Sequence, residues 1–263
     1  MKKYILASDY DGTLNQDGRI TEETIEAINR FRRKGNLFGI VSGRDYVNGF
    51  EYFKRNNTFP FDFVIASNGA CAYDKDGNIY FAQKVNGMLS FGESTLAQEL
   101  ISQCLQLSSN PCGMSFDKTR YDFHPEYPLG AKVGDTQYTA LSVLKNVDEF
   151  VLSNAVCDTV EQATEVTAIL KKKFGYYVNP MQNGRCIDIS PAGVDKATGI
   201  ACLADCLEIP YEDGWTAGDN FNDMPMIEKY HGCAMAGGVD ELRKVSEYIC
   251  ASVANVIEII LSK

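Results

Sequence analysis

Short apolar runs alternate with amphipathic segments at the start of the chain. The apolar runs at 3–8, 37–41 and 61–66 are typical of strands that are buried on both faces. Between the first two, Thr21 is a suitable helix N-cap and Lys34-Gly35 a suitable helix end, and a second helix is predicted at about 45–55. This β-α-β-α-β alternation predicts a parallel sheet with helices on both faces.

The pattern changes in the middle of the chain. A hairpin is predicted around 73–81, and Asn183-Gly184 is a strong hairpin turn signal further on. The other predicted elements are helices at about 93–107 and 159–174, and strands near Met114 and Phe150 and at 176–181 and 185–189. Long helices with hairpins indicate a separate α+β module inserted into the parallel domain.

The parallel pattern then resumes. A helix is predicted from Lys196 to about Leu207, followed by strands at 214–217 and 232–236 and by closing helices at 239–246 and 253–261. The sequence therefore predicts an α/β protein with two domains. Residues 1–82 and 190–263 form a Rossmann-like core with a parallel sheet, and residues 83–189 form an inserted α+β cap.

Candidate chemistry begins where the first predicted strand ends. Asp9 and Asp11 are spaced i, i+2, so both carboxylates can face the same side. Gly12 permits a sharp turn, and Thr13 adds a hydroxyl group. One acid could attack a substrate while the other moves protons. The alternative is an acidic turn after an edge strand; a calcium loop is excluded, because an EF-hand needs glycine where Leu14 stands.

Polar groups also follow other predicted strands. Ser42-Gly43-Arg44 follows the second, Asn68 the third, and the motif from Gly218 to Asp223 follows the strand at 214–217. In an open α/β sheet, ligands bind at these carboxyl ends. Each motif alone has an ordinary explanation: a helix entry for the serine motif, a solvated cation for Lys196, and helix capping for the last acids.

Four of these motifs, taken together and in this order, resemble the haloacid dehalogenase-like hydrolase superfamily. They are the turn from Asp9 to Thr13, Ser42-Gly43-Arg44, Lys196 at a helix start, and Gly218 to Asp223. The long insert is similar to the large α/β cap of its Cof-type (class IIB) sugar phosphatases, and the resemblance covers nearly the whole chain. Two departures are Ser42, where many members carry threonine, and Ala197, where glycine often follows the lysine. The resemblance implies a Mg²⁺-dependent phosphatase that hydrolyses small phosphorylated metabolites, such as sugar phosphates, through an aspartyl-phosphate.

The resemblance also implies roles for the acids. Asp9 is expected to attack phosphorus, and Asp11 to protonate the leaving alcohol and then activate water. Asp9 and Asp219, with the backbone carbonyl of Asp11, are expected to bind Mg²⁺. Asp223 is expected to support the metal shell or to pair with Lys196.

A further set is expected to hold the substrate. The expected ligands of the phosphoryl oxygens are Ser42, the Gly43 backbone N–H, Lys196 and Asn222. The cap would close as a lid and recognise the leaving group. The candidate substrate contacts are Arg44, Tyr10, Tyr46, Asn179, Gln182 and Arg185.

Charge and composition limit the kinds of binding partner and the cellular location that we expect. A formal net charge of −10 argues against nucleic acid, so the local positive field for an anionic substrate must come from Lys196 and a metal ion. The sequence carries no run of about 20 apolar residues that would cross a membrane and no signal peptide, and its nine scattered cysteines suit reduced thiols, which predicts a cytoplasmic protein. Two other functions stay open: a phosphomutase or phosphotransferase acting on sugar phosphates, and a non-catalytic sensor of a phosphorylated ligand.

Overall fold

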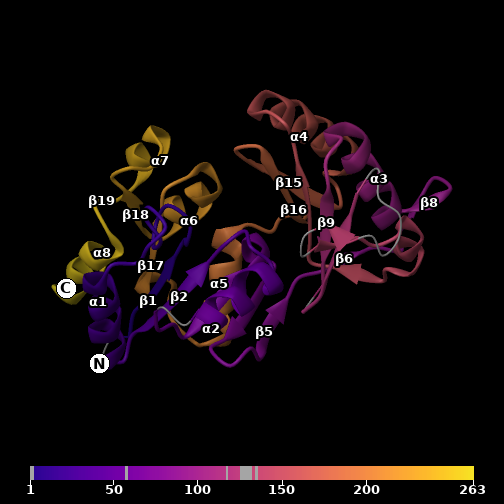
Figure 1. Cartoon of the computed structure of the whole chain (residues 1–263). Coiled ribbons are helices and arrows are strands. Elements are labelled where there is room, and N and C mark those ends of the chain that lie inside the picture. The colour runs from indigo at the N-terminus through magenta and orange to yellow at the C-terminus, as the bar shows by residue number, and fades with distance from the viewer. Residues whose placement is uncertain (1–2, 57–58, 117, 125–131, 134–135) are drawn as a thin grey trace. The chain divides into compact units, whose positions relative to one another are not determined.

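The computed structural model describes residues 3–56, 59–116, 118–124, 132–133 and 136–263, and the chain divides into two compact units (Figure 1). Unit 1 comprises Met1–Arg44, Asn48–Phe81 and Asp195–Lys263, and unit 2 comprises Asp45–Val47 and Ala82–Val194. Unit 2 thus spans the expected insert, 83–189, and extends beyond it to Val194. The extension arises because the Val194 carbonyl accepts hydrogen bonds from Asn179 and Ser190 of unit 2.

Unit 1 is built on an eight-stranded sheet in the order β19-β18-β17-β1-β2-β3-β4-β5. Its strands are β1 (Ile5–Ser8), β2 (Leu37–Val41), β3 (Phe63–Ala66), β4 (Cys71–Asp74), β5 (Ile79–Ala82), β17 (Gly214–Gly218), β18 (His231–Met235) and β19 (Tyr248–Cys250). The strands from β19 to β3 pair in parallel, and β4 pairs antiparallel with β3. The predicted α/β class with a parallel core sheet is therefore confirmed.

Helices cover the sheet of unit 1. They are α1 (Glu22–Arg33), a π-helical turn (Tyr46–Phe50, its first two residues in unit 2) leading into α2 (Glu51–Asn56), α5 (Lys196–Cys206), α6 (Met224–Lys229), α7 (Asp240–Val245) and α8 (Val253–Leu261). Ile5 and Ala7 of β1 share a buried cluster with Ile200 and Leu203 of α5. Leu6 lies between them in β1 and is fully buried, so both faces of this strand are apolar, which explains its continuous apolar run.

The order of strands determines where the functional groups gather. β1 lies between β2 and β17 (Figure 1), and from there the chain adds strands in opposite directions, to β3 on one side and β19 on the other. Such a switch point leaves a crevice at the carboxyl ends of the strands. The loop with Asp9 and Asp11 leaves β1 at that edge, beside the loops that follow β2 and β17.

Unit 2 has a five-stranded antiparallel sheet in the order β10-β9-β14-β16-β15. Its strands are β9 (Cys112–Ser115), β10 (Arg120–Phe123), β14 (Leu152–Val156), β15 (Val178–Asn183) and β16 (Cys186–Pro191). Helices α3 (Leu96–Ser108) and α4 (Val160–Phe174) bury one face through Cys112, Met114 and Ile187. Short two-stranded pairs complete the unit: β6 (Val85–Asn86) with β13 (Glu149–Phe150), β7 (Ser90–Phe91) with β8 (Ser94–Thr95), and β11 (Lys132–Val133) with β12 (Thr136–Gln137).

Several element boundaries differ from the sequence prediction. The helix expected at about 93 begins at Leu96, because Ser94 and Thr95 pair in β8 and Thr95 then forms a capping box with Gln98. Tyr248–Cys250 was not predicted as a strand, yet it forms the edge strand β19. Only one of its three residues is buried, so its sequence carries no clear strand pattern. In the described part of the chain, no helix has both the length and the apolar character of a membrane span.

Candidate active site

The loop after β1 is fixed by contacts with the loop after β17. The Asp9 amide donates to the Ala217 carbonyl at 2.8 Å, and the Thr13 hydroxyl donates to Asp219 Oδ1 at 2.7 Å. Gly12 has φ +85°, and a Cβ at this position would overlap the Asp219 carboxylate. Glycine is therefore required here for two reasons, backbone conformation and space. The result is a turn that brings two distant acids, Asp9 and Asp219, into one group.

Lys196 reaches this group from the first residue of α5. Asp195 caps that helix and forms a capping box with Thr198, which fixes where the helix begins. The Lys196 Nζ lies 2.6 Å from Asp9 Oδ1 and 2.5 Å from Asp223 Oδ1, and the residue is only 1% exposed. A buried ammonium of this kind must be paired, and here it is paired twice.

Both carboxylate oxygens of Asp223 accept hydrogen bonds. While Oδ1 accepts from Lys196, Oδ2 accepts the backbone N–H groups of Asp219 and Asn220 at 2.9 and 3.0 Å. Gly218 makes room for this carboxylate, because a Cβ at Gly218 would overlap it. Of the two roles expected for Asp223, this geometry matches the pairing with Lys196.

The electrostatics of the group are dominated by burial. Burial raises the pKa of Asp9 to about 8, with Asp223 adding to the rise and Lys196 opposing it. Burial likewise raises the pKa of Asp219, against the hydrogen bond from Thr13. Burial acts to lower the pKa of Lys196, but the negative charges of Asp223 and Asp9 outweigh it and raise that pKa instead. The protein thus concentrates more negative charge here than its own ammonium neutralises.

That surplus charge is what a divalent cation would balance. Carboxylate oxygens of Asp9, Asp219 and Asp223 lie within 4.8 Å of one another. When ionised, the three carboxylates carry three negative charges against the one ammonium of Lys196 that reaches them, and all the donor atoms are oxygen, as Mg²⁺ prefers. A bound cation would keep Asp9 ionised despite its raised pKa. The residues therefore fit the expected metal. Among the described residues, the side-chain hydrogen bonds to Asp9 and Asp219 engage only Oδ1, from Lys196 and Thr13 respectively, whereas both oxygens of Asp223 already accept hydrogen bonds from the protein.

The loop after β2 supplies the next group. Ser42 is buried, its Oγ accepts the Arg44 N–H at 3.2 Å, and its carbonyl accepts the Asn68 N–H at 3.0 Å. Gly43 and Asn222 are half-buried, and Asn222 directly precedes Asp223. Arg44 forms a two-pronged ion pair with Asp11, which is the exposed acid of the first motif.

A family model agrees with this arrangement of motifs. The model described as haloacid dehalogenase-like hydrolase matches residues 6–260, which is nearly the whole chain. The chain belongs to the haloacid dehalogenase-like hydrolase family. The predictions of family and enzyme class, a hydrolase of the phosphatase type, are thereby confirmed.

Relatives of this haloacid dehalogenase-like hydrolase are matched over almost their full length. The 5-amino-6-(5-phospho-D-ribitylamino)uracil phosphatase YitU of Bacillus subtilis is 24% identical over 266 residues, covering 95% of this chain and 93% of YitU. TM0651 from Thermotoga maritima has a TM-score of 0.73 at 22% identity, covering 98% and 97% of the two chains. BT4131, described as a subclass IIB sugar phosphatase, has a TM-score of 0.75 at 19% identity, covering 98% of each chain. The likeness to BT4131, whose fold matches over 98% of this chain, agrees with the Cof-type resemblance at the level of the fold.

The residues expected to contact the leaving group lie in different places. In unit 2, Asn179 is half-buried on the sheet face opposite α3 and α4, and Arg185 is exposed at the β15–β16 turn, 3.5 Å from the Asp158 carbonyl. Gln182 instead bonds to Thr164 and the Val160 carbonyl of α4. The structure does not gather these residues into one site.

Two tyrosines were also expected near the substrate. Tyr10 is only 4% exposed and packs against Phe53, with ring centroids 4.6 Å apart, so its side chain belongs to the core of this hydrolase. Tyr46 belongs to unit 2, where the Lys118 ammonium lies 5.5 Å from its ring centroid.

Sequence reasoning missed a polar cluster in unit 2. Arg120 is largely buried, with Nη1 2.8 Å from Asp45 Oδ2, Nη2 2.7 Å from Asn154 Oδ1 and Nε 2.8 Å from Asp122 Oδ1. Ser115 donates to the same Asp45 oxygen at 2.6 Å. The one available signal was the alternation Arg-Tyr-Asp-Phe at 120–123, which places arginine and aspartate on one face of a strand.

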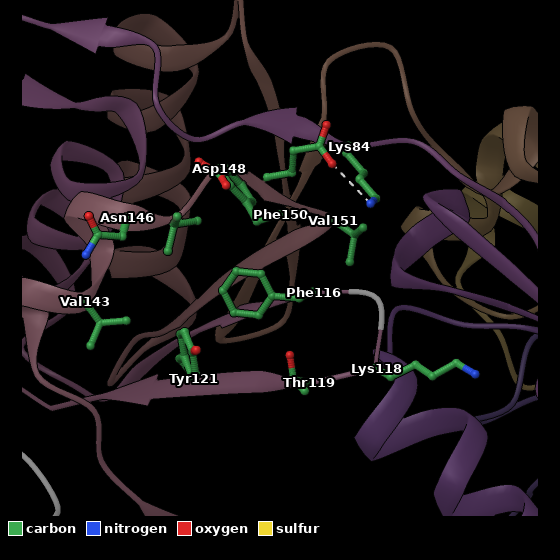
Figure 2. A pocket seen from close by; sticks show the side chains of 12 residues that line it. Lys84, Phe116, Lys118, Thr119, Tyr121, Val143, Asn146, Asp148, Phe150 and Val151 are labelled. Atoms are coloured by element: carbon green, nitrogen blue, oxygen red, sulfur yellow. Dashed lines mark ion pairs between the residues drawn. The ribbon is translucent and has the colours of Figure 1, made fainter.

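Unit 2 also contains a cavity of about 660 Å³. Phe116 and Phe150 are among the side chains that line it (Figure 2), and so are Lys84 and Glu149, which form an ion pair at 3.1 Å. None of the leaving-group contacts expected from the sequence is among the described residues that line this cavity.

Proposed function

We propose that the protein hydrolyses phosphate monoesters of small, sugar-like metabolites, with Asp9 as the nucleophile. The observation that supports this most is the pairing of buried Lys196 with Asp9 and Asp223 beside Asp219. A phosphate monoester is anionic, so its hydrolysis requires a nucleophile held in place and positive charge around it. A pure binding protein would need no buried nucleophile.

In the first step, an Asp9 oxygen attacks phosphorus and the bond from phosphorus to the leaving alcohol breaks. Lys196 keeps the attacking carboxylate oriented, because Asp223 fixes the ammonium from the other side. Asp11 delivers a proton to the departing oxygen, and the alcohol leaves. The Ser42 hydroxyl, the Gly43 N–H and the Asn222 amide bind the remaining phosphoryl oxygens.

In the second step, water attacks the phosphorus of the Asp9 acyl phosphate. Asp11, now a carboxylate, removes a proton from that water, and Asp9 is released as a carboxylate together with inorganic phosphate. Bound Mg²⁺ would be held by Asp9, Asp219 and the Asp11 carbonyl, and it would neutralise charge on the phosphoryl group. We assign unit 2 the role of a lid that recognises the leaving group.

The names of relatives support the proposed substrate class. YitU and YwtE of Bacillus subtilis are both named as phosphatases of a phosphorylated ribitylaminouracil, and BT4131 as a sugar phosphatase. Phosphorylated polyols and sugars share the chemistry of a primary or secondary alkoxide leaving group next to further hydroxyl groups. A polar lid that donates and accepts hydrogen bonds suits such substrates.

The test is a phosphate-release assay with Mg²⁺ over a panel of sugar, polyol and nucleotide phosphates. We expect Asp9→Asn to lower kcat by at least about a thousandfold, because the carboxamide cannot form the acyl phosphate. Asp76→Asn, at an exposed acid of the β4–β5 turn, is the matched control and should turn over normally. Near-normal activity of Asp9→Asn would refute the mechanism. Phosphate transfer to a second sugar, with little release to water, would indicate a phosphotransferase.

A further inference from the structure

Both carboxylate oxygens of Asp11 are occupied by one guanidinium. Arg44 Nε lies 2.9 Å from Asp11 Oδ2, and Arg44 Nη2 lies 2.7 Å from Asp11 Oδ1. This two-pronged geometry is the strong form of an arginine–carboxylate pair. It conflicts with the task assigned to Asp11, because an acid or base must present an oxygen to the leaving group or to water rather than to an arginine.

The guanidinium itself is held by other contacts. Its central carbon lies 5.2 Å from the Tyr10 ring centroid and 5.1 Å from the Tyr52 ring centroid, as in cation–π contacts with two neighbouring rings. Nη1 lies 3.4 Å from the Asn48 carbonyl. The Arg44 backbone is fixed as well, because its N–H donates to Ser42 Oγ and its carbonyl accepts from the Ser67 N–H. Asp11 can therefore leave while the guanidinium stays.

A phosphoryl group would compete for the same donors. Arg44 follows directly after Ser42 and Gly43, the expected ligands of the phosphoryl oxygens. Its planar fork matches two phosphate oxygens as well as it matches two carboxylate oxygens. Each of these N–H donors points at one oxygen, and the guanidinium keeps its charge throughout. An anion that binds Nε and Nη2 together therefore displaces the anion that held them before.

We propose that Arg44 is a positioning residue that exchanges partners: it holds Asp11 in the free enzyme, and releases Asp11 when a phosphoryl group takes its fork. This inference rests on the proposed function of Asp11. The exchange makes Asp11 available for proton transfer only when a substrate occupies the site. Between turnovers, Asp11 neutralises the positive charge of Arg44 in the loop after β2.

The first test is a double-mutant cycle on the binding of inorganic phosphate, measured by calorimetry at fixed pH and Mg²⁺ concentration. Asp11→Asn should lower the Kd for phosphate in any background, because a negative charge is removed. If Arg44 must leave Asp11 to bind phosphate, Asp11→Asn should lower the Kd about fivefold more with Arg44 present than with Arg44→Gln, as expected for a partly exposed pair. The same factor in both backgrounds would overturn the exchange.

The chain offers a matched control pair in the same unit. Arg32 forms the same two-pronged contact with Asp62, at 2.8 and 2.6 Å, but Asp62 directly precedes β3, at the opposite end of the strands. Arg32→Gln and Asp62→Asn should leave the Kd for phosphate unchanged. A change as large as that from the Arg44 variants would show that any lost ion pair loosens the site, and would also overturn the proposal.

The second test uses turnover. Arg44→Lys keeps the charge but replaces the fork by an ammonium, whose three donors can serve Asp11 and a phosphoryl oxygen together, so substrate binding no longer releases Asp11. We therefore expect kcat for an alkyl phosphate, whose leaving group needs a proton, to fall on the order of tenfold. For p-nitrophenyl phosphate, whose leaving group departs without a proton, kcat should fall less than about threefold. Equal losses on both substrates would refute the role of Arg44 in positioning Asp11. Phosphate binding needs no turnover, so an inactive wild-type protein would refute the proposed function without deciding the binding cycle.

Discussion

Replacing Lys196 by methionine tests the centre of the site through stability rather than activity. The change keeps an unbranched apolar side chain, one atom shorter, but removes the ammonium. Asp9 and Asp223 would then be buried carboxylates without their ion pair, at 10% and 0% side-chain exposure. In the metal-free protein we expect the free energy of unfolding of unit 1 to fall.

The magnitude follows from what each carboxylate keeps. Removing one partner of a buried ion pair generally costs about 3–5 kcal/mol. Asp223 retains two backbone N–H donors, from Asp219 and Asn220, so most of its desolvation stays compensated. Asp9 loses its ion pair and has only the surrounding dipoles. We therefore expect a loss of about 3–4 kcal/mol, of which Asp9→Asn in the same chain should restore about half by removing the charge that has lost its partner.

Urea unfolding followed by tryptophan fluorescence measures the stability of unit 1 specifically. Trp215 is the single tryptophan of the chain, lies in β17 and is 2% exposed, with its ring stacked on His231 and Tyr248. Its emission therefore reports the unfolding of this unit. Lys75→Met, at an exposed lysine paired with Asp76, is the control and should not shift the midpoint. A loss below about 1 kcal/mol for Lys196→Met would show that the two ion pairs do not hold the site together.

Three further predictions concern the metal, the turn and the phosphate loop. EDTA should abolish phosphate release and lower the unfolding midpoint of the Trp215 signal, and added Mg²⁺ should restore both. Gly12→Ala should lower kcat at least about tenfold, because the methyl group meets the Asp219 carboxylate at a positive φ; unchanged activity would contradict the geometry. Ser42→Thr should keep kcat/KM within about threefold of the wild type, whereas Ser42→Ala should lower it about tenfold; equal effects would exclude a role for the hydroxyl.

Some strands, helix ends and motifs of this protein could be predicted because they depend on interactions between residues that are close in the sequence. Strands such as β2 appear as apolar runs, because a strand covered on both faces cannot carry polar side chains. Thr21 was predicted as the cap of α1, and the structure shows its hydroxyl accepting the Thr24 N–H. The acids and the serine motif were identified because they directly follow apolar runs. Such features depend on neighbours within a few residues.

Other features depend on residues far apart in the chain. No sequence pattern predicts that Arg44 pairs with Asp11 across 33 positions, or that Arg120 meets Asp45 across 75. The edge strand β19 and the burial of Tyr10 likewise depend on which elements the fold brings together. Side-chain direction at these positions is set by packing, which single-sequence periodicity does not report.

The sequence by itself determined the reaction class, because the Asp9, Ser42 and Asp219 motifs at strand ends, together with Lys196 at a helix start, carry the chemistry. Tertiary structure decided how those groups are charged and paired. Burial raises the pKa of Asp9 and obliges Lys196 to bridge two carboxylates, and burial is a property of the whole packed unit. Tertiary structure also decided that Asp11 faces Arg44. That contact forms because the parallel pairing of β1 with β2 brings the turn after β1 and the loop after β2 together.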